Sequence, residues 1–344
     1  VTLRTLGSGD NAVQTRYNYY QWNASINGGK LQQIYTTRGT TPMQNFQYQY
    51  DSNANITSIH DYIVGSPQTQ SFQYDNLDRL TSAGASGGVR GNYGPEAYTY
   101  DAATGNLASK AGVVYTYGSS HKHAVTALSN GNMYQYDANG NMTQRVANGQ
   151  TYNFGYDAES RMTSVSGAAT AQFVYDGDGA RVIATEGVTT TVFVGNYFEY
   201  NVTGGQITKY YYAAGVRVAM QRGGEGVKLI LGDHLGSTSV VLNADGSSLG
   251  TQGYDAWGLP RFTTGTVPTK YTFTGQYRDS YINLYWYNSR WMDPELGRFT
   301  QPDTIIPRNQ GVLAYDRFAY ANNNALKYTD PSGHEICDAD GQCG

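Results

Sequence analysis

The stretch Tyr134-Gln-Tyr-Asp-Ala-Asn-Gly-Asn141-Met-Thr143 decides the fold, because close copies of it recur along the chain. The alternation of aromatic and polar residues that opens it is typical of a half-buried β-strand. The Asp-Ala-Asn-Gly that follows is turn chemistry, since short polar side chains cap turns and tolerate positive φ. Alternation then resumes, so each copy predicts one β-hairpin.

The Tyr-Asp pair at the centre of this stretch marks the repeat. It recurs at Tyr50-Asp51, Tyr74-Asp75, Tyr100-Asp101, Tyr136-Asp137, Tyr156-Asp157, Tyr175-Asp176 and Tyr254-Asp255. One hairpin cannot bury its own apolar face, so neighbouring hairpins must pair into one continuous sheet. Each repeat then places a tyrosine ring inside, with a hydroxyl that needs a partner. We predict an all-β protein of stacked hairpins that form a wound, barrel-like sheet.

Composition excludes several classes of protein. The 344 residues include 32 tyrosines and 42 glycines, and 23 Lys and Arg stand against 27 Asp and Glu, for a net charge of −4. An aromatic content of 13% argues against disorder. The acidic balance, without a basic cluster, argues against a nucleic-acid partner. No apolar run approaches the roughly 20 residues that a membrane span needs.

The cysteines and the glycosylation-type triplets bear on the compartment. Cys337 and Cys343 are candidates for a small disulfide loop, with two free thiols as the alternative. Such a pair favours an oxidising compartment. Four Asn-x-Ser/Thr triplets are candidates for glycosylation on surface loops, namely those at Asn23, Asn55, Asn141 and Asn201. No ligand set for a metal is evident, and we expect no metal and no cofactor.

After about residue 205 the repeat gives way to other motifs. They include Leu231-Gly-Asp-His-Leu-Gly236, Tyr285-Trp-Tyr-Asn-Ser-Arg-Trp291, Asp293-Pro-Glu-Leu-Gly-Arg-Phe299, Gln301-Pro-Asp303 and Tyr328-Thr-Asp-Pro-Ser-Gly333. In this order and spacing they resemble the Rhs-repeat-associated core domain. The Tyr-Asp units resemble the YD repeats that precede that core in Rhs and toxin-complex C proteins. The resemblance divides the chain into YD-repeat hairpins at 1–205, a core domain at 206–334 and a tail at 335–344.

The resemblance implies a function. YD repeats of this family form a hollow shell that encloses a C-terminal polypeptide, often a toxin, and the core domain plugs one end. The protein is then secreted or at the cell surface, and its partner is its own C-terminal cargo. In many members the core is also an aspartyl autoprotease.

The site residues follow by motif match. Asp303 and Asp330 are then the two carboxylates, and Arg298 is the nearby arginine. The cut falls after Gly333 and His334, before Glu335. The chemistry is coherent, because two carboxylates held close share one proton and supply an acid and a base.

Two departures from the family pattern stand out. His334 occupies a position where the family more often has Leu or Met, and Thr304 follows Asp303 where many members have Pro. Without the resemblance, both aspartates would be interpreted as turn openers.

Two other functions stay open on the residues alone. One is a structural extracellular protein whose sheet edges pair with other copies of itself into a fibre. A weaker one is carbohydrate binding by Trp257, Trp286 and Trp291. Buried sheet edges would favour the shell, and a long uncovered edge would favour the fibre.

Overall fold

A computed structural model describes residues 2–63, 67–118, 120–305, 311–338 and 342–343. Its main element is a 25-stranded sheet in which each strand pairs antiparallel with the next one along the chain. A four-stranded and a two-stranded sheet follow. The described residues contain short 3-10 helices and no α-helix, and none of these helices is long and apolar enough to cross a bilayer.

The first half of the main sheet consists of β1 (Leu3–Leu6), β2 (Val13–Tyr19), β3 (Leu31–Arg38), β4 (Thr41–Tyr50), β5 (Ile56–Asp61), β6 (Gln68–Tyr74), β7 (Leu80–Ser86), β8 (Tyr93–Tyr100), β9 (Leu107–Lys110), β10 (Val113–Tyr117), β11 (Val125–Leu128) and β12 (Met133–Tyr136). The second half consists of β13 (Met142–Ala147), β14 (Gln150–Tyr156), β15 (Met162–Gly167), β16 (Ala171–Tyr175), β17 (Arg181–Glu186), β18 (Thr189–Val194), β19 (Phe198–Asn201), β20 (Gln206–Ala213), β21 (Val216–Arg222), β22 (Lys228–Gly232), β23 (Thr238–Asn243), β24 (Ser248–Tyr254) and β25 (Pro260–Gly265). The remaining strands are β26 (Tyr277–Asp279), β27 (Leu284–Trp286), β28 (Trp291–Asp293), β29 (Arg298–Phe299), β30 (Tyr328–Thr329) and β31 (Cys337–Asp338). The 3-10 helices are η1 (Gly9–Asn11), η2 (Ser25–Asn27), η3 (Phe273–Gly275), η4 (Gly311–Tyr315) and η5 (Ala321–Asn323).

The aspartate of each repeat caps its turn. In the stretch that opens the sequence, Asp137 Oδ1 accepts the backbone N–H groups of Asn139 and Asn141, each at 2.9 Å. Its Oδ2 accepts the Asn141 side-chain amide at 2.9 Å. Gly140 adopts φ of 88°, the left-handed conformation that the turn requires. The same device recurs at Asp233 in the Gly232–Gly236 turn, so this motif is a repeat turn without its tyrosine.

In six of the seven Tyr-Asp repeats, the tyrosine bonds to the preceding hairpin. Its ring lies on the inner side of the sheet, and its hydroxyl donates to a backbone carbonyl one hairpin earlier in the chain. These bonds, of 2.7 to 2.9 Å, join Tyr50 to Leu31, Tyr74 to Ile56, Tyr100 to Leu80, Tyr156 to Met142, Tyr175 to Met162 and Tyr254 to Thr238. The predicted need of these hydroxyls for partners is met in this way.

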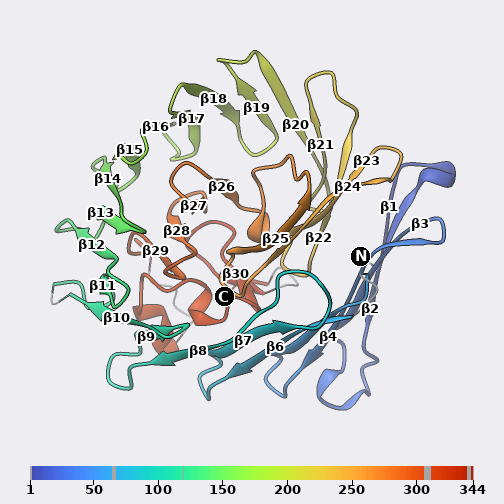
Figure 1. Cartoon of the computed structure of the whole chain (residues 1–344), viewed down its shortest axis with the longest axis horizontal. Coiled ribbons are helices and arrows are strands. Elements are labelled where there is room, and N and C mark those ends of the chain that lie inside the picture. The colour runs from blue at the N-terminus through green and yellow to red at the C-terminus, as the bar shows by residue number, and fades with distance from the viewer. Residues whose placement is uncertain (1, 64–66, 119, 306–310, 339–341, 344) are drawn as a thin grey trace.

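The strip of strands curves into a ring (Figure 1). The strand register shifts at the repeat tyrosine, for example between Gln73 and Tyr74 and between Gly155 and Tyr156. Such bulges bend a strand and increase its twist. Because they recur at the same place in each hairpin, the bends add up in one direction.

The two ends of the strip overlap. Gln44 of β4 donates through Nε2 to the Gly232 carbonyl of β22 at 2.9 Å and to Ser239 Oγ of β23 at 2.6 Å. Arg261 of β25 donates to the Gly91 carbonyl at 2.7 Å, beside β8. Apolar side chains fill the overlap, namely Val13, Ala219, Leu229, Leu231, Val240 and Leu242. The ring is therefore closed by sheet-on-sheet packing.

The segment after β25 lies inside the ring, where β26 to β30 are seen in Figure 1. Buried charges fix it to the wall. Arg145 of β13 forms an ion pair with Asp293 of β28, with 2.9 Å between Nε and Oδ2, and both side chains are at most 2% exposed. Lys110 of β9 donates to the backbone carbonyls of Pro294 and Glu295 at 3.1 and 2.9 Å. We call residues 270–338 the plug.

The structure confirms the all-β wound sheet. The sheet runs without a break through residue 205, where the sequence pattern changes, and ends at Gly265. Trp257, Trp286 and Trp291 are at most 5% exposed, which removes the basis for carbohydrate binding on them.

The triplet asparagines differ in exposure. Asn55 and Asn141 do not lie on surface loops, since both are at most 1% exposed and their amides bond to Asp51 and Asp137. Neither is therefore available to carry a glycan in the folded protein, contrary to the expectation from the triplets. Asn23 is exposed and Asn201 is half-buried.

The tyrosine bonds predict a stability effect. We expect Tyr74→Phe to lower the free energy of unfolding by about 1–2 kcal/mol, because the Ile56 carbonyl loses its 2.8 Å partner inside the protein. Urea unfolding measures the change. Tyr62→Phe is the control, since that side chain is 43% exposed. Equal losses in the two variants would contradict a specific role of the Tyr74 hydroxyl.

Candidate active site

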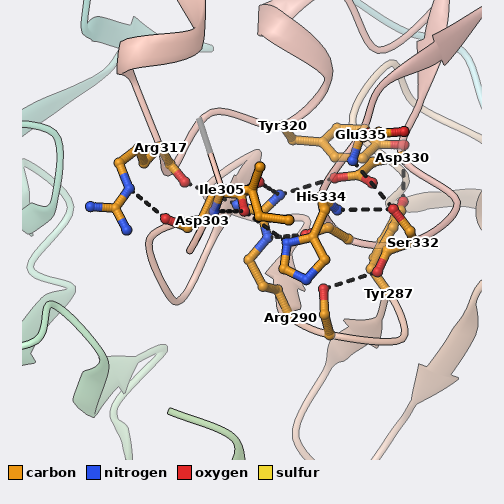
Figure 2. Close-up of polar contacts among 12 residues, drawn as sticks. Tyr287, Arg290, Asp303, Ile305, Arg317, Tyr320, Asp330, Ser332, His334 and Glu335 are labelled. Carbon is orange, nitrogen blue, oxygen red and sulfur yellow. Dashed lines mark hydrogen bonds and ion pairs between the residues drawn. The ribbon is translucent and has the colours of Figure 1, made fainter. Parts of the chain in front are cut away.

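The two carboxylates expected from the motifs meet at one guanidinium group. Asp303 follows β29, Asp330 follows β30, and Arg290 lies between β27 and β28. Arg290 Nη2 is 2.9 Å from Asp303 Oδ2 and 3.0 Å from Asp330 Oδ2 (Figure 2). All three residues are at most 5% exposed. The fold thus brings together two acids that are 27 residues apart in the sequence.

Arg290 is itself held on three sides. Its guanidinium lies 3.7 Å from the centre of the Phe299 ring. Its Nε donates to the Gly333 carbonyl, and its Nη1 donates to the Arg317 carbonyl at 3.0 Å. A buried guanidinium with these fixed partners gives the two carboxylates one defined geometry.

Arg298 lies elsewhere and corrects the motif match. Its Nη2 is 2.7 Å from Asp316 Oδ2 and donates to the His123 carbonyl at 3.0 Å. It connects the plug to the wall, and Arg290 occupies the place next to the carboxylates that was expected for it. The sequence did hold a sign of this, because Arg290 stands within the aromatic-rich stretch Tyr285–Trp291, and a buried charge needs a partner.

The two aspartates have different surroundings. Asp303 Oδ1 accepts from His334 Nδ1 at 2.8 Å and from the Ile305 N–H at 2.9 Å, and its Oδ2 faces Arg290. Asp330 Oδ1 is buried, and the backbone N–H groups of Gly333 and His334 approach this carboxyl closely enough to act on its pKa. The contacts of Asp303 match an ionised carboxylate, which only accepts, whereas Asp330 has an oxygen that can carry a proton.

The pKa of Asp330 agrees with this asymmetry. Burial raises it to about 6; the charge of Arg290 and the backbone N–H groups of Gly333 and His334 oppose the rise, and the charge of Asp303 adds to it. Asp330 is therefore protonated at mildly acidic pH, where it can act as an acid.

The segment expected to be cut passes directly by these groups. Gly333 has φ of 78°, and a Cβ there would collide with Ser289 Oγ and with the Tyr287 carbonyl, so only glycine fits. The N–H groups of His334 and Glu335 approach Ser332 Oγ at 3.2 and 3.3 Å. The peptide bond between these two residues is thus held in place beside Asp303 and Asp330 (Figure 2).

Two cavities adjoin this segment. A small one of about 20 Å³ is lined by both carboxylates, Arg290, Arg317, His334 and Ile336, among others. That volume is enough for one water molecule, and the lining offers it several polar partners. The main cavity, of about 1430 Å³, is bounded by the inner face of the ring and by the plug, and His334 lines it as well.

The tail after His334 runs along the main cavity. Its strand β31 pairs with β30, and Cys337, Asp338 and Cys343 line the cavity. Cys337 and Cys343 are joined in a disulfide. Among the residues that the structure describes, no group of three or more His, Cys, Asp or Glu side chains is placed to hold a metal ion.

Comparisons with known proteins assign the family. The family model of the teneurin YD-shell matches residues 11–325. The chain therefore belongs to the YD-shell family, which confirms the resemblance drawn from its sequence. It is 24% identical over 298 residues to the tRNA nuclease WapA of Bacillus subtilis, covering 84% of this chain and 11% of that protein. It is 34% identical over 107 residues to Salivary gland surface protein 1 of Aedes aegypti, covering 30% of this chain and 3% of that protein.

Solved structures show the same fold. The chain matches a crystal structure of TcdB2-TccC3-Cdc42 with a TM-score of 0.75 at 19% identity, covering 94% of this chain and 18% of that one. It matches the Tc holotoxin pore of Photorhabdus luminescens, with a mutated TccC3, at a TM-score of 0.72 and 17% identity, covering 94% and 18%. The chain thus spans only a small part of these relatives, whose activities belong to much longer proteins.

The raised pKa of Asp330 predicts a pH dependence of stability. A carboxyl whose pKa is higher in the folded chain than in the unfolded chain stabilises the fold fully below pH 4, and this contribution is lost as the pH rises through 6. The loss amounts to about 3 kcal/mol, from a difference of about two pKa units. Asp330→Asn should flatten this part of a plot of unfolding free energy against pH. An unchanged slope, with the exposed Glu225→Gln as control, would contradict the assignment.

Proposed function

We propose that this chain is the closing end of a YD shell that holds a polypeptide attached to its C-terminus, and that Asp303 and Asp330 cut the chain after His334. The observation that carries the proposal is the buried pair of carboxylates on Arg290, with the His334–Glu335 peptide and a water-sized cavity beside it. Turn formation alone would not require two acids to share one buried cation.

The arrangement supports hydrolysis by an acid and a base. Asp303 takes a proton from water, whose oxygen bonds to the carbonyl carbon of His334, while Asp330 gives its proton to the carbonyl oxygen. When the tetrahedral intermediate collapses, the bond to the Glu335 nitrogen breaks. That nitrogen receives the proton held by Asp303, and Asp330 regains its own. Water is thus consumed and both carboxyls return to their starting states.

The direction of the tail supports enclosure. Residues beyond the proposed cut line the main cavity. Its volume of about 1430 Å³ exceeds the roughly 300–1,000 Å³ of ordinary ligand pockets and suits an unfolded segment of polypeptide better than a folded domain. The partner that we propose is accordingly the polypeptide that the shell carries at its own C-terminus.

An extracellular or cell-surface location fits this function. The disulfide between Cys337 and Cys343 is of the kind that persists in oxidising compartments. The relatives include part of a holotoxin pore and a protein named for the salivary gland surface. We propose that this protein too is secreted or displayed at the surface.

Cleavage is tested on the chain itself. Mass spectrometry should show loss of the ten residues after His334 at pH 5, and Asp303→Asn and Asp330→Asn should each abolish it, because an amide can act neither as base nor as acid. Glu225→Gln, an exposed carboxyl converted in the same way, should cleave normally. Undiminished cleavage in both aspartate variants, with native thermal stability, would refute the protease.

A fibre formed through strand edges is the second candidate. It rests on β1, which pairs only with β2 among the described strands and so leaves one edge open. The other terminal strand, β25, is partly covered, since Arg261 reaches Gln68 and the loop before β8.

Electron microscopy separates the two functions. The shell predicts discrete particles of the native protein, because the overlap closes the ring. Regular filaments would favour the fibre instead and would leave Asp303 and Asp330 as structural residues.

A further inference from the structure

His334, the residue just before the proposed cut, also contacts the proposed base. We propose that its imidazole is a positioning residue for its own cleavage, and that it orients Asp303 toward the water. The inference rests on the proposed function and deepens it, since part of the machinery would then belong to the segment being cut. Its sequence position is one where the family pattern favours side chains that cannot do this.

The contact has one chemically consistent form. His334 Nδ1 lies 2.8 Å from Asp303 Oδ1. An ionised carboxylate only accepts, so the proton of this hydrogen bond is on Nδ1. The imidazole is then either the neutral form protonated on Nδ1 or the imidazolium, and both forms donate.

The imidazole completes a set of donors around Asp303. Oδ1 accepts hydrogen bonds from His334 Nδ1 and from the Ile305 N–H, and Oδ2 forms an ion pair with Arg290. Without the imidazole, the Ile305 N–H would be the one donor to Oδ1 left among the described residues, and the carboxylate plane would lose the contact on the side of the scissile segment. General-base catalysis depends on this orientation, because the base must lie within hydrogen-bond reach of the water.

Several charged side chains surround the His334 imidazole. His334 shares the small cavity with three carboxyls and two guanidinium groups, those of Asp303, Asp316, Asp330, Arg290 and Arg317. On its other side the main cavity brings in Asp338 from β31. A protonated imidazole therefore adds a positive charge next to both acids of the site. A positive charge there favours the ionised form of Asp330 and makes it lose its proton at lower pH.

Two substitutions of similar shape separate positioning from packing. Asn places an amide nitrogen about where Nδ1 lies, so His334→Asn keeps a donor and removes the titrating group. His334→Leu removes both. At pH 5 we expect His334→Leu to cleave roughly 10- to 100-fold more slowly, as misplaced catalytic groups do. His334→Asn should cleave nearly as fast as the unchanged chain.

The pH dependence of the cleavage rate gives a second readout, because a change in side-chain packing alone would not shift it. Where the imidazole is the imidazolium, both variants should shift the alkaline limb to higher pH, because the positive charge near Asp330 is gone. A His334→Leu chain with the rate and limb of the unchanged chain would overturn the proposal. So would equal slowing by Leu and Asn without any shift of the limb, which would indicate packing of the ring.

A measurement independent of cleavage separates this inference from the proposed function. In the Asp330→Asn chain, which should stay uncut, nitrogen NMR should show a proton on His334 Nδ1, and Asp303→Asn should alter that resonance. A proton on Nε2 alone would overturn the inference even if the protease is real. An uncut wild-type chain with the expected Nδ1 proton would instead refute the protease, and with it the positioning role.

Discussion

The hydrogen bond from the repeat tyrosine to the preceding hairpin, made in six of the seven Tyr-Asp repeats, is the interaction on which the structure depends. A tyrosine ring on the inner side of the sheet buries its hydroxyl, and a buried hydroxyl without a partner is costly. Tyr74, for example, finds the Ile56 carbonyl, but only at a register shift next to the aspartate-capped turn. Satisfying the hydroxyl thus favours a bend in each hairpin that makes this bond. The curvature of the whole ring follows from a local requirement repeated along the chain.

The ring in turn determines where the plug and its site lie. Its inner face offers aromatic rings and a few buried charges, and the charges of the plug must find partners there. Arg145 on the wall forms an ion pair with Asp293 of the plug. The side-chain amide of Asn324 in the plug donates to Asn55 Oδ1 in a repeat turn. Inside the plug, Arg290 joins the segments that carry the two catalytic candidates. Because an unpaired buried charge is strongly destabilising, this arginine fixes the approach of those segments.

The sequence alone predicted those parts of this protein whose structure depends on residues that are neighbours in the chain. The hairpins, their capped turns and the inward tyrosines follow from the spacing of Tyr and Asp alone. It did not predict contacts between segments of the plug that are far apart in the sequence. Asp303, Asp330 and Arg298 were placed by resemblance, and the placement of Arg298 failed because a motif match does not show which of two arginines beside aromatic residues faces the carboxylates. Only the fold decides which of them faces Asp316. Asn55 was misjudged for a similar reason, since a triplet does not reveal burial.

Both aspartates accept backbone N–H groups from the residues that follow them, as turn openers do, but turn formation does not account for the cation that they share. Asp303 does accept the N–H two residues on, as the repeat aspartates do. Asp330 is likewise approached by the N–H groups of Gly333 and His334, but it is also buried beside a second acid and a shared cation. A turn does not need two acids on one buried cation, and burying such charges is costly. A buried acid with a raised pKa and a specific charge partner is the kind of group found at functional sites, and it supports the role proposed for Asp330.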